Sequence, residues 1–289
     1  MPSFSALPVV VVHWNQPARC LATLAAFRAQ GVPVRFVVVD SGSRSDAVAA
    51  LRRSVGADAE LIELGRNVGF GPAANVGFRR VLDGDGPEWI ALAPHDAEPA
   101  PGCLARLLEV ASPRESAGLV CADVGDGSTP LVDRYLGALV EPARFAAGWE
   151  PAAYPHGTLL LARRACLVEV GLLDERYFAY CEEADLGLRA RRAGWEVGIV
   201  RGARVTNGHL GTGTATVDYL QQRNTLLLVR EHFGRYPAAV RLALGLVELA
   251  VGTVLPGRRP PLFSARARVR ALGDHLQGRT GPPPAGLQP

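Results

Sequence analysis

Three carboxylates stand within four positions of one another, at Glu182, Glu183 and Asp185, in the stretch YFAYCEEADLGLRARRAGW. A carboxylate within hydrogen-bond reach of a substrate hydroxyl can act as a general base if its pKa lies below the working pH. The same residues also suit the first turn of a helix, where acidic side chains meet the positive end of the helix dipole. Asp185 and Arg189 have the spacing of an ion pair on one helix face. The stretch therefore has a catalytic and a structural interpretation, and the rest of the sequence must decide between them.

Apolar runs of strand length recur through the first part of the chain, and helix-like or glycine-rich segments separate the first four of them. The runs are LPVVVVH at 7–13, VRFVVVDSG at 34–42, AELIELG at 59–65, EWIALAPHD at 88–96 and AGLVCADV at 117–124. Consecutive Val and Ile residues are typical of strands buried on both faces, as in a parallel sheet covered by helices. The pattern predicts an α/β fold with a mostly parallel central sheet and flanking helices.

Polar side chains follow four of these runs, at the strand ends where ligands bind in open α/β sheets. They are His13, Trp14 and Asn15; Asp40, Ser41 and Ser43; the polar and glycine-rich residues 67–75; and Pro94, His95 and Asp96. Asp40 could accept hydrogen bonds from a pyrimidine base or a ribose hydroxyl, or it could form a local turn with the serines that follow. Trp14 could form the wall of a base pocket, or it could be a core residue. These residues predict a ligand site at the carboxyl edge of the sheet.

The segment NVGFGPAAN at 67–75 raises one alternative function. Gly69, Gly71 and Ala74 have the spacing of a dinucleotide fingerprint, which would indicate a nicotinamide-dependent oxidoreductase. That fingerprint should follow the first strand of its unit. Here it follows the third apolar run, and the first run, VVVVHWNQ, contains no glycine. The oxidoreductase is therefore the less favoured interpretation.

Six motifs occur in a fixed order along the chain. They read VVVVHWNQ, VVVDSGSRSD, GRNVGFGPAANVGF, ALAPHD, YFAYCEEADLGLRARRAGW and VTNGHLG. With these motifs the chain resembles the family 2 glycosyltransferases over nearly its whole length, and most closely their rhamnosyltransferase-like bacterial branch. The resemblance implies the nucleotide-sugar-binding fold called GT-A, a divalent metal ion, and sugar transfer with inversion at the anomeric carbon.

The resemblance also assigns roles to individual side chains. Glu183 aligns with the general base, where the family usually has Asp, and Glu182 beside it is the alternative base. Asp185 would orient the acceptor or the helix, and Arg189 would pair with Asp185 or with phosphate. Contacts to the nucleotide-sugar donor are expected from His13, Trp14, Asn15, Asp40, Ser41, Ser43, Asn67, Gly69, Phe70, Gly71, Asn75, His95 and Arg189.

A metal site is implied at Asp96, the last acid of the family's metal-binding motif, with His209 as a further ligand. Oxygen ligands suit Mg²⁺ or Mn²⁺, which bridge diphosphate oxygens and neutralise charge on the leaving group. The sequence departs from the family here, because Pro94 stands where a second acid is usual and His95 lies between the two. A protein that binds nucleotide sugars without catalysis would explain this departure, and it is the second alternative function.

We expect a GT-A glycosyltransferase domain at 1–215 and a helical C-terminal extension at 216–289 with a disordered, Pro- and Gly-rich tail. Residues up to about 125 would form the nucleotide-binding half of the domain, and the turn-rich sequence from about 126 would begin the acceptor-binding half. The expected donor is a dTDP- or UDP-sugar of rhamnose or another hexose or deoxyhexose. The acceptor hydroxyl would belong to a lipid-linked glycan or a small molecule, in glycan or natural-product biosynthesis.

The chain has 289 residues with 31 basic and 28 acidic side chains, so its formal charge of +3 gives no strong attraction to nucleic acid. It contains no lysine, and its five widely spaced cysteines lack the close pairs of a zinc or redox motif. The N-terminal apolar run is too short for a signal peptide and lacks a basic region before it. We therefore expect a cytoplasmic protein with reduced thiols.

The segment at 236–261 is apolar for nearly the length of a membrane span, but Arg241 and Glu248 interrupt it. A transmembrane helix needs about 20 predominantly apolar residues, so spanning is disfavoured. The alternatives are core packing, a homodimer contact, and a helix in a membrane interface with the arginines beyond Pro256 near anionic headgroups. We expect the last of these, with the protein peripheral at the inner face of the membrane.

Overall fold

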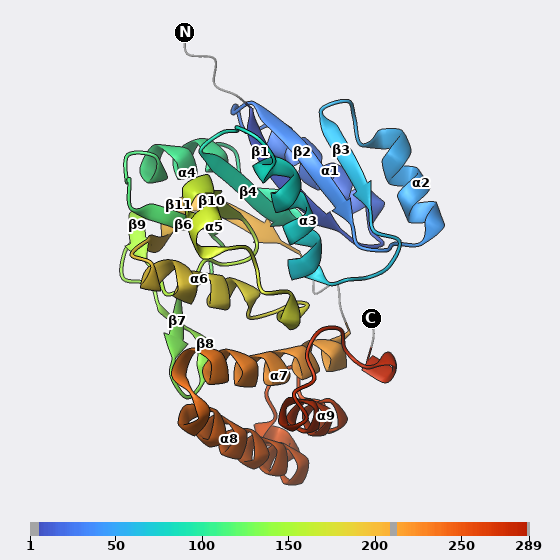
Figure 1. Cartoon of the computed structure of the whole chain (residues 1–289), viewed down its shortest axis with the longest axis vertical. Helices are drawn as coiled ribbons and strands as arrows, with labels where there is room; N and C mark the ends of the chain where they lie inside the picture. The colour runs from blue at the N-terminus through green and yellow to red at the C-terminus, as the bar shows by residue number, and fades with distance from the viewer. Residues whose placement is uncertain (1–5, 209–212, 288–289) are drawn as a thin grey trace.

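The computed structural model describes residues 6–208 and 213–287 of the chain. Its first half alternates strands with helices and short turns (Figure 1). The elements are β1 (Leu7–His13), α1 (Pro17–Arg28), β2 (Val34–Asp40), α2 (Ser45–Ser54), β3 (Ala59–Glu63), α3 (Phe70–Leu82), β4 (Trp89–Pro94), β5 (Ala97–Pro99), α4 (Cys103–Ala111) and β6 (Ala117–Asp123). All five strands that the apolar runs predict are present, as β1, β2, β3, β4 and β6.

The second half is less regular and ends in three long helices. Its elements are β7 (Ser128–Asp133), β8 (Gly137–Pro142), β9 (Gly148–Pro151), β10 (Leu160–Arg163), α5 (Arg164–Val170), α6 (Glu182–Arg192), β11 (Glu196–Asn207), α7 (Thr214–Phe233), α8 (Arg235–Val254) and α9 (Ala265–Leu276). Short 3₁₀ turns occur at Glu175–Tyr177, Pro256–Arg258 and Ala285–Leu287. Strand β11 has 12 residues and ends with the VTN that begins the last of the six motifs.

The central sheet has the strand order β3-β2-β1-β4-β10-β6-β11-β5, and β9 pairs with β11 off this path. Pairs β1–β2, β2–β3, β1–β4 and β6–β11 are parallel, whereas β10 runs antiparallel to both of its neighbours. The strands β7 and β8 form a separate hairpin. Because β1 to β4 are all parallel, their carboxyl ends meet at one edge of the sheet.

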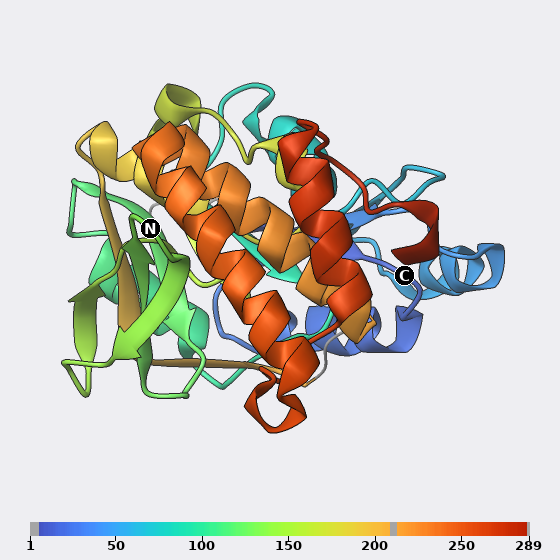
Figure 2. The same ribbon diagram turned by 90° about the horizontal axis from the view of Figure 1, so that it is seen from below.

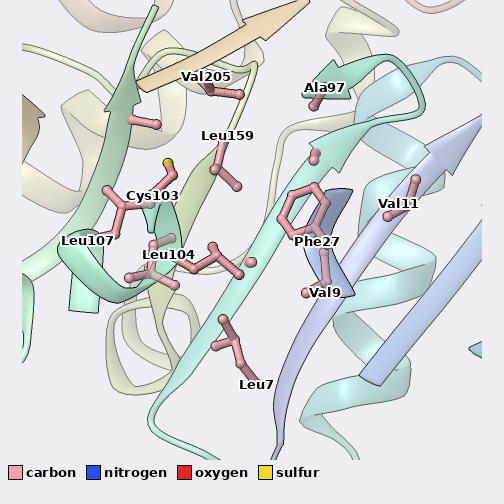
Figure 3. Close-up of a cluster of buried hydrophobic side chains, with 14 of the residues drawn as sticks. Leu7, Val9, Val11, Phe27, Ala97, Cys103, Leu104, Leu107, Leu159 and Val205 are labelled. Atoms are coloured by element: carbon pink, nitrogen blue, oxygen red, sulfur yellow. The ribbon is translucent and has the colours of Figure 1, made fainter. Parts of the chain in front are cut away.

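Both faces of the sheet are buried. Val9 and Val11 of β1 belong to one hydrophobic cluster with Phe27 of α1, and Figure 3 shows these three side chains together. Val10, which points to the opposite face, belongs to a second cluster with Phe78 of α3. Successive residues of a strand point to opposite faces, so the uninterrupted valines of β1 reflect helices packed on both sides.

Helix α7 lies between the α/β part and the outer helices α8 and α9 (Figure 1), and Figure 2 shows α8 and α9 side by side on the outer face. The sequence predicts a disordered tail after these helices. In the structure, residues 278–287 lie against the body of the protein. The amide of Gly281 donates to the Arg176 carbonyl at 2.7 Å, and the Thr216 hydroxyl donates to the Leu287 carbonyl at 2.6 Å.

Candidate active site

A cavity of about 500 Å³ opens at the carboxyl ends of β1 and β2. It is lined by Trp14, Asn15, Gly42, Ser43, Arg44, Arg66, Asn67, Phe178, Pro282 and Pro283. Ligand cavities in proteins range from roughly 300 to 1,000 Å³, so this one can hold a nucleoside. Four of the residues expected to contact the donor form part of the wall. The two arginines were not predicted, and the two prolines come from the tail that was expected to be disordered.

Asp40, at the end of β2, is buried and bonded to the turns around it. Its Oδ2 accepts from His13 Nδ1 at 2.8 Å and from the Ser43 hydroxyl, and its Oδ1 accepts from the Ser43 amide at 2.9 Å. The other ring nitrogen, His13 Nε2, accepts from the Gln16 amide at 3.1 Å, which leaves the imidazole proton on Nδ1. These bonds join the turn after β1 to the turn after β2.

The hydrogen bonds also set the charge of this carboxylate. Burial alone would raise the pKa of Asp40, but the bonds from His13 and Ser43 outweigh it and lower the pKa below its ordinary value. Asn15 adds two further links between these turns. Its backbone amide donates to Ser43 Oγ at 2.7 Å, and its side-chain Oδ1 accepts from the Arg44 backbone amide at 2.8 Å. Asp40 and His13 thus lie behind Asn15 and Ser43 and fix their positions in the cavity wall.

Replacing Asp40 with alanine is expected to weaken nucleotide binding and to lower the unfolding temperature together. The change leaves the buried His13 N–H without its acceptor, which costs about 1–3 kcal/mol. It also releases Ser43, a residue of the cavity wall. Calorimetry with a free nucleotide and a thermal melt measure the two effects. Asp85→Ala is the control, since Asp85 is an exposed residue of the loop between α3 and β4. An Asp40→Ala protein with parental affinity and melting temperature would contradict this role.

The glycine-rich turn before α3 packs against the loop that precedes α6. Gly69 has φ +94°, and a methyl group there would lie 2.3 Å from the Phe178 carbonyl oxygen. The same carbonyl accepts from the Gly71 amide at 3.2 Å, and Asn67 Oδ1 accepts from the Gly69 amide at 2.9 Å. Phe70 between them packs into the cluster on one face of the sheet. Close packing within the protein thus explains Gly69 without a pyrophosphate, whereas a methyl group on Gly71 would make only an ordinary contact, 3.6 Å from Glu182 Cγ.

Ser41 and Asn75 are buried and do not line the cavity. The Ser41 hydroxyl accepts from the Val68 amide at 3.1 Å and supports the glycine-rich turn. Asn75 makes a reciprocal pair with the backbone of Leu173: its Nδ2 donates to the carbonyl at 2.8 Å, and its Oδ1 accepts from the amide at 3.0 Å. Both residues therefore connect segments that surround the site.

Glu182 and Glu183 begin α6 directly after a strained loop. Phe178, Tyr180 and Cys181 have φ angles of +68°, +68° and +73°, in a region that non-glycine residues rarely adopt. Such residues cost about 1–3 kcal/mol each and concentrate at functional sites. The strain therefore supports the catalytic interpretation of the acidic stretch over the purely structural one.

Asn224 of α7 is fully buried and holds this loop in place. Its Nδ2 lies 2.9, 2.7 and 2.8 Å from the carbonyl oxygens of Tyr177, Ala179 and Tyr180. The neighbouring Arg223 donates to the Tyr177 carbonyl as well, at 3.2 Å. Neither residue was predicted from the sequence. The available signal was weak, because the Arg-Asn pair follows two glutamines and precedes a threonine in a polar stretch of the helix.

The two glutamates have different surroundings. Glu182 is buried, and its Oε2 has no hydrogen-bond partner among the described residues. Glu183 is partly exposed, and its Oε1 would lie 2.0 Å from a methyl group on Gly157, so only glycine at 157 permits this position. Burial raises the pKa of Glu183 to about 7. Burial, with the charge of Glu183 added, raises the pKa of Glu182 well above its ordinary value. Glu183 is therefore the carboxyl that ionises first.

Asp185 and Arg189 are not brought to the cavity. Asp185 is buried, and its carboxylate accepts from Arg189 Nε at 2.9 Å and from His232 Nε2 at 2.7 Å. Arg189 also donates to the Leu172 carbonyl at 2.6 Å. The group ties α6 to the segment after α5 and to α7. Of the two roles predicted for Asp185, this placement favours orienting the helix, and it gives Arg189 protein partners in place of phosphate.

Comparison with known proteins identifies the family. Residues 9–168 match the family described as Glycosyl transferase family 2. The chain belongs to this family. It is also similar to the N-acetylglucosaminyl-diphospho-decaprenol L-rhamnosyltransferase of Mycobacterium tuberculosis, with 31% identity over an alignment of 277 positions. The alignment covers 82% of this chain and 89% of the relative. The predicted resemblance to family 2, and to its rhamnosyltransferase-like branch, is confirmed.

Solved glycosyltransferases share the fold of this family 2 protein. The mannosyltransferase PcManGT from Pyrobaculum calidifontis, solved with GDP-Man and Mn²⁺, has a TM-score of 0.62 and 17% identity, covering 96% of this chain and 89% of that one. GalNAc-T7, solved with UDP, GalNAc and Mn²⁺, has a TM-score of 0.59 and 14% identity, covering 96% and 55%. Staphylococcus aureus TarS, residues 1–349, has a TM-score of 0.53 and 14% identity, covering 94% and 80%. At these identities the likeness concerns the fold, and the expected GT-A architecture is confirmed.

The metal ligands expected in this glycosyltransferase are described only in part. Asp96 follows β4 at the carboxyl edge of the sheet and is partly exposed, whereas His209 lies outside the described residues. His95 Nε2 is buried without a hydrogen-bond partner in the described part of the chain, and burial, then the nearby His13, lower the pKa of His95 to about 4. Within 6–208 and 213–287, no group of three or more His, Cys, Asp or Glu side chains could hold a metal ion. Mg²⁺ commonly binds one or two carboxylates plus substrate phosphates, so Asp96 fits an ion shared with a diphosphate.

Proposed function

We propose that this family 2 glycosyltransferase transfers a deoxyhexose such as rhamnose from a dTDP- or UDP-sugar to a hydroxyl of a lipid-linked glycan, with inversion. The observation that carries the proposal is the carboxylate of Glu183, which is partly exposed, has a raised pKa and sits beside Gly157. The loop before it contributes Phe178 to the cavity wall, so the acid and the cavity share one loop. A base of this pKa is well suited to catalysis near neutral pH.

The proposed step is a single displacement. A carboxylate oxygen of Glu183 takes the proton of the acceptor hydroxyl, and the oxygen of that hydroxyl forms the new bond to the anomeric carbon. The bond from the anomeric carbon to the diphosphate oxygen breaks on the opposite face of the sugar, and its electron pair leaves with the nucleoside diphosphate. Attack opposite the leaving group inverts the configuration at this carbon. Asp96 would bind Mg²⁺ or Mn²⁺, which neutralises charge on the departing diphosphate.

The donor nucleoside is proposed to occupy the cavity at the ends of β1 and β2. Trp14 offers an aromatic face, Arg44 and Arg66 offer positive charge, and Asn15 and Asn67 offer polar groups. The acceptor is proposed by analogy with the mycobacterial relative, whose name describes a decaprenol-linked substrate. A cytoplasmic location at the inner face of a membrane, where such acceptors and nucleotide sugars meet, is part of the same proposal.

The experiment is a transfer assay with dTDP- and UDP-sugars, a polyprenyl-diphosphate sugar acceptor, and either Mg²⁺ or Mn²⁺. The anomeric configuration of the product, determined by NMR, must be opposite to that of the donor. Retention of configuration would exclude the displacement above. Donor binding without transfer to any hydroxyl acceptor would favour the alternative of a non-catalytic nucleotide-sugar-binding protein.

The rate of transfer is expected to fall with acidity below about pH 7. Only ionised Glu183 can take a proton, and burial raises the pKa of Glu183 to about 7. Below that pKa the ionised fraction decreases about tenfold per pH unit, and the rate should decrease in proportion. The measurement is kcat/KM from pH 5 to pH 9 at saturating metal, with donor binding followed separately. A profile that stays flat down to pH 5 would show that no group of this pKa acts as the base.

A further inference from the structure

After Arg235, helix α8 directs its two charged residues, Arg241 and Glu248, toward α7 and α9 and its apolar residues to the outer side. Arg241 is 7% exposed, and it donates to Glu248 at 2.8 Å and to Gln222 of α7 at 3.1 Å. Arg268 of α9 donates to the same Glu248 at 3.2 Å. In a helix on the surface of a soluble protein, the apolar face normally points to the core and the charged face points to solvent. In α8 this arrangement is reversed.

The outer face of α8 is uncharged over the whole length of the helix after Arg235. Its exposed large side chains, with those of the turn that follows, are Tyr236, Leu244, Leu246, Val247, Val254 and Leu255. Tyr236 is 71% exposed and Val254 is 73% exposed, although they stand at opposite ends of the helix. By length and composition α8 could cross a membrane. Its most apolar stretch has a mean hydropathy of 1.6, and only 28% of that stretch is buried. Exposed apolar patches of this kind mark interaction surfaces.

The charge around this face is positive. Residues 235–289 contain eight arginines and two acidic residues, a net charge of +6, so residues 1–234 carry −3 of the formal total of +3. Both acids form ion pairs inside this segment: Glu248 with Arg241 and Arg268, and Asp274 with Arg270 and Arg279. Glu248 keeps 42% of its side chain exposed, and the exposed arginines of this segment that make no ion pair among the described residues are Arg235, Arg258, Arg259 and Arg266.

We propose that the outer face of α8 docks on an anionic membrane surface, with the helix lying in the plane of the interface and the exposed arginines at its two ends, Arg235, Arg258 and Arg259, against lipid headgroups. An apolar face bordered by basic residues is the pattern of helices that bind in this way. Crossing the bilayer would expose Arg241 and Glu248 to hydrocarbon and break their bonds to α7 and α9. A two-fold dimer through the same face would place one +6 segment against another.

The orientation has a consequence that rests on the proposed function. Helix α7 packs on α8 and α9 on one side, and its Asn224 holds the loop before Glu183 on the other. Two helix layers, α8 and α7, thus separate the docking face from the proposed base, by roughly 20 Å in all. A polyprenyl-linked acceptor could remain in the membrane while its sugar hydroxyl reaches the site.

The test measures co-sedimentation of the full chain with vesicles of phosphatidylglycerol and phosphatidylcholine in equal parts, without any sugar nucleotide. The parent is expected to bind these vesicles, to bind pure phosphatidylcholine much less, and to lose binding at high salt. The double variant Leu246→Gln, Val247→Gln should bind at least about tenfold more weakly, because two buried apolar side chains are lost from the contact. The double variant Arg235→Gln, Arg258→Gln should weaken anionic binding by roughly fivefold per arginine.

The matched control is Val168→Gln, since Val168 on α5 is 70% exposed but lies away from α8. Equal binding by this control and the Leu246, Val247 variant would overturn the proposal, as would the absence of binding to either vesicle. Resistance to carbonate extraction would mean insertion. A parent that is dimeric without lipid, and monomeric in the Leu246, Val247 variant, would assign the face to self-association. Because the readout is vesicle binding, failure of the transfer assay leaves this result unaffected.

Discussion

Replacing Glu183 with glutamine is expected to abolish sugar transfer while leaving donor binding nearly intact. The amide has the size of the carboxylate and can occupy the space beside Gly157, but it cannot take the acceptor proton. General-base assistance typically accelerates a reaction about 10²- to 10⁴-fold, so kcat should fall by about that factor. This corresponds to a loss of about 3 to 5 kcal/mol of transition-state stabilisation. The measurements are kcat with a saturating acceptor and the dissociation constant of the donor by calorimetry.

Glu182→Gln is the paired control for this prediction. Glu182 is buried, its Oε2 has no hydrogen-bond partner among the described residues, and burial with the charge of Glu183 raises its pKa, so it is expected to be protonated when Glu183 is charged. An amide should replace a protonated acid there with a small effect on kcat. An inactive Glu182→Gln protein beside an active Glu183→Gln protein would move the base by one residue. Near-parental activity in both variants would mean that the two acids serve only as charges in the first turn of α6.

Replacing Asp96 with alanine is expected to remove the metal dependence of donor binding while the fold is retained. The side chain is partly exposed at the end of β4, so its loss leaves no large cavity in the core. Loss of a residue that only orients a metal ligand typically costs 10- to 100-fold in metal affinity, so loss of a ligand should cost at least about 100-fold. Calorimetry of the nucleotide-sugar donor with and without Mn²⁺ measures the effect.

Glu98→Ala provides the matched control, because Glu98 is a nearby exposed carboxylate on β5. It should bind donor and metal like the parent protein. If the Asp96→Ala protein also retains metal-dependent donor binding, the assignment of Asp96 fails. If Glu98→Ala is the defective variant, the metal is bound two residues further along the chain.

The sequence predicted the fold well because its strongest signals are local. The unbroken valines of β1 and β2 require burial on both faces, and a strand buried in this way has few alternatives. The polar residues after each strand then fall at a common edge by geometry alone. Trp14, Asn15, Ser43 and Asn67 line the cavity for this reason.

The roles of buried polar residues could not be predicted in the same way. Asn75 and Leu173 are partners across 98 residues, and Asn224 reaches back 44 to 47 residues to the loop before α6. No spacing rule in a single sequence connects such pairs. Asp185 illustrates the problem, because its helical spacing to Arg189 was visible but its bond to His232 was not. A residue that lies beside a catalytic motif in the sequence therefore also lies near it in the fold. Its role depends on the side chains and backbone groups that it contacts.

The position of the tail has a practical consequence for handling the protein. Pro282 and Pro283 form part of the cavity wall, and Leu287 is held by Thr216. An affinity tag or a fusion partner joined after residue 287 would begin within a few residues of the donor cavity, where it would compete with or displace this segment. Leu7 begins β1, and the cavity opens at the other end of that strand. Tags, immobilisation chemistry and reporter fusions therefore belong at the N-terminal side of the domain.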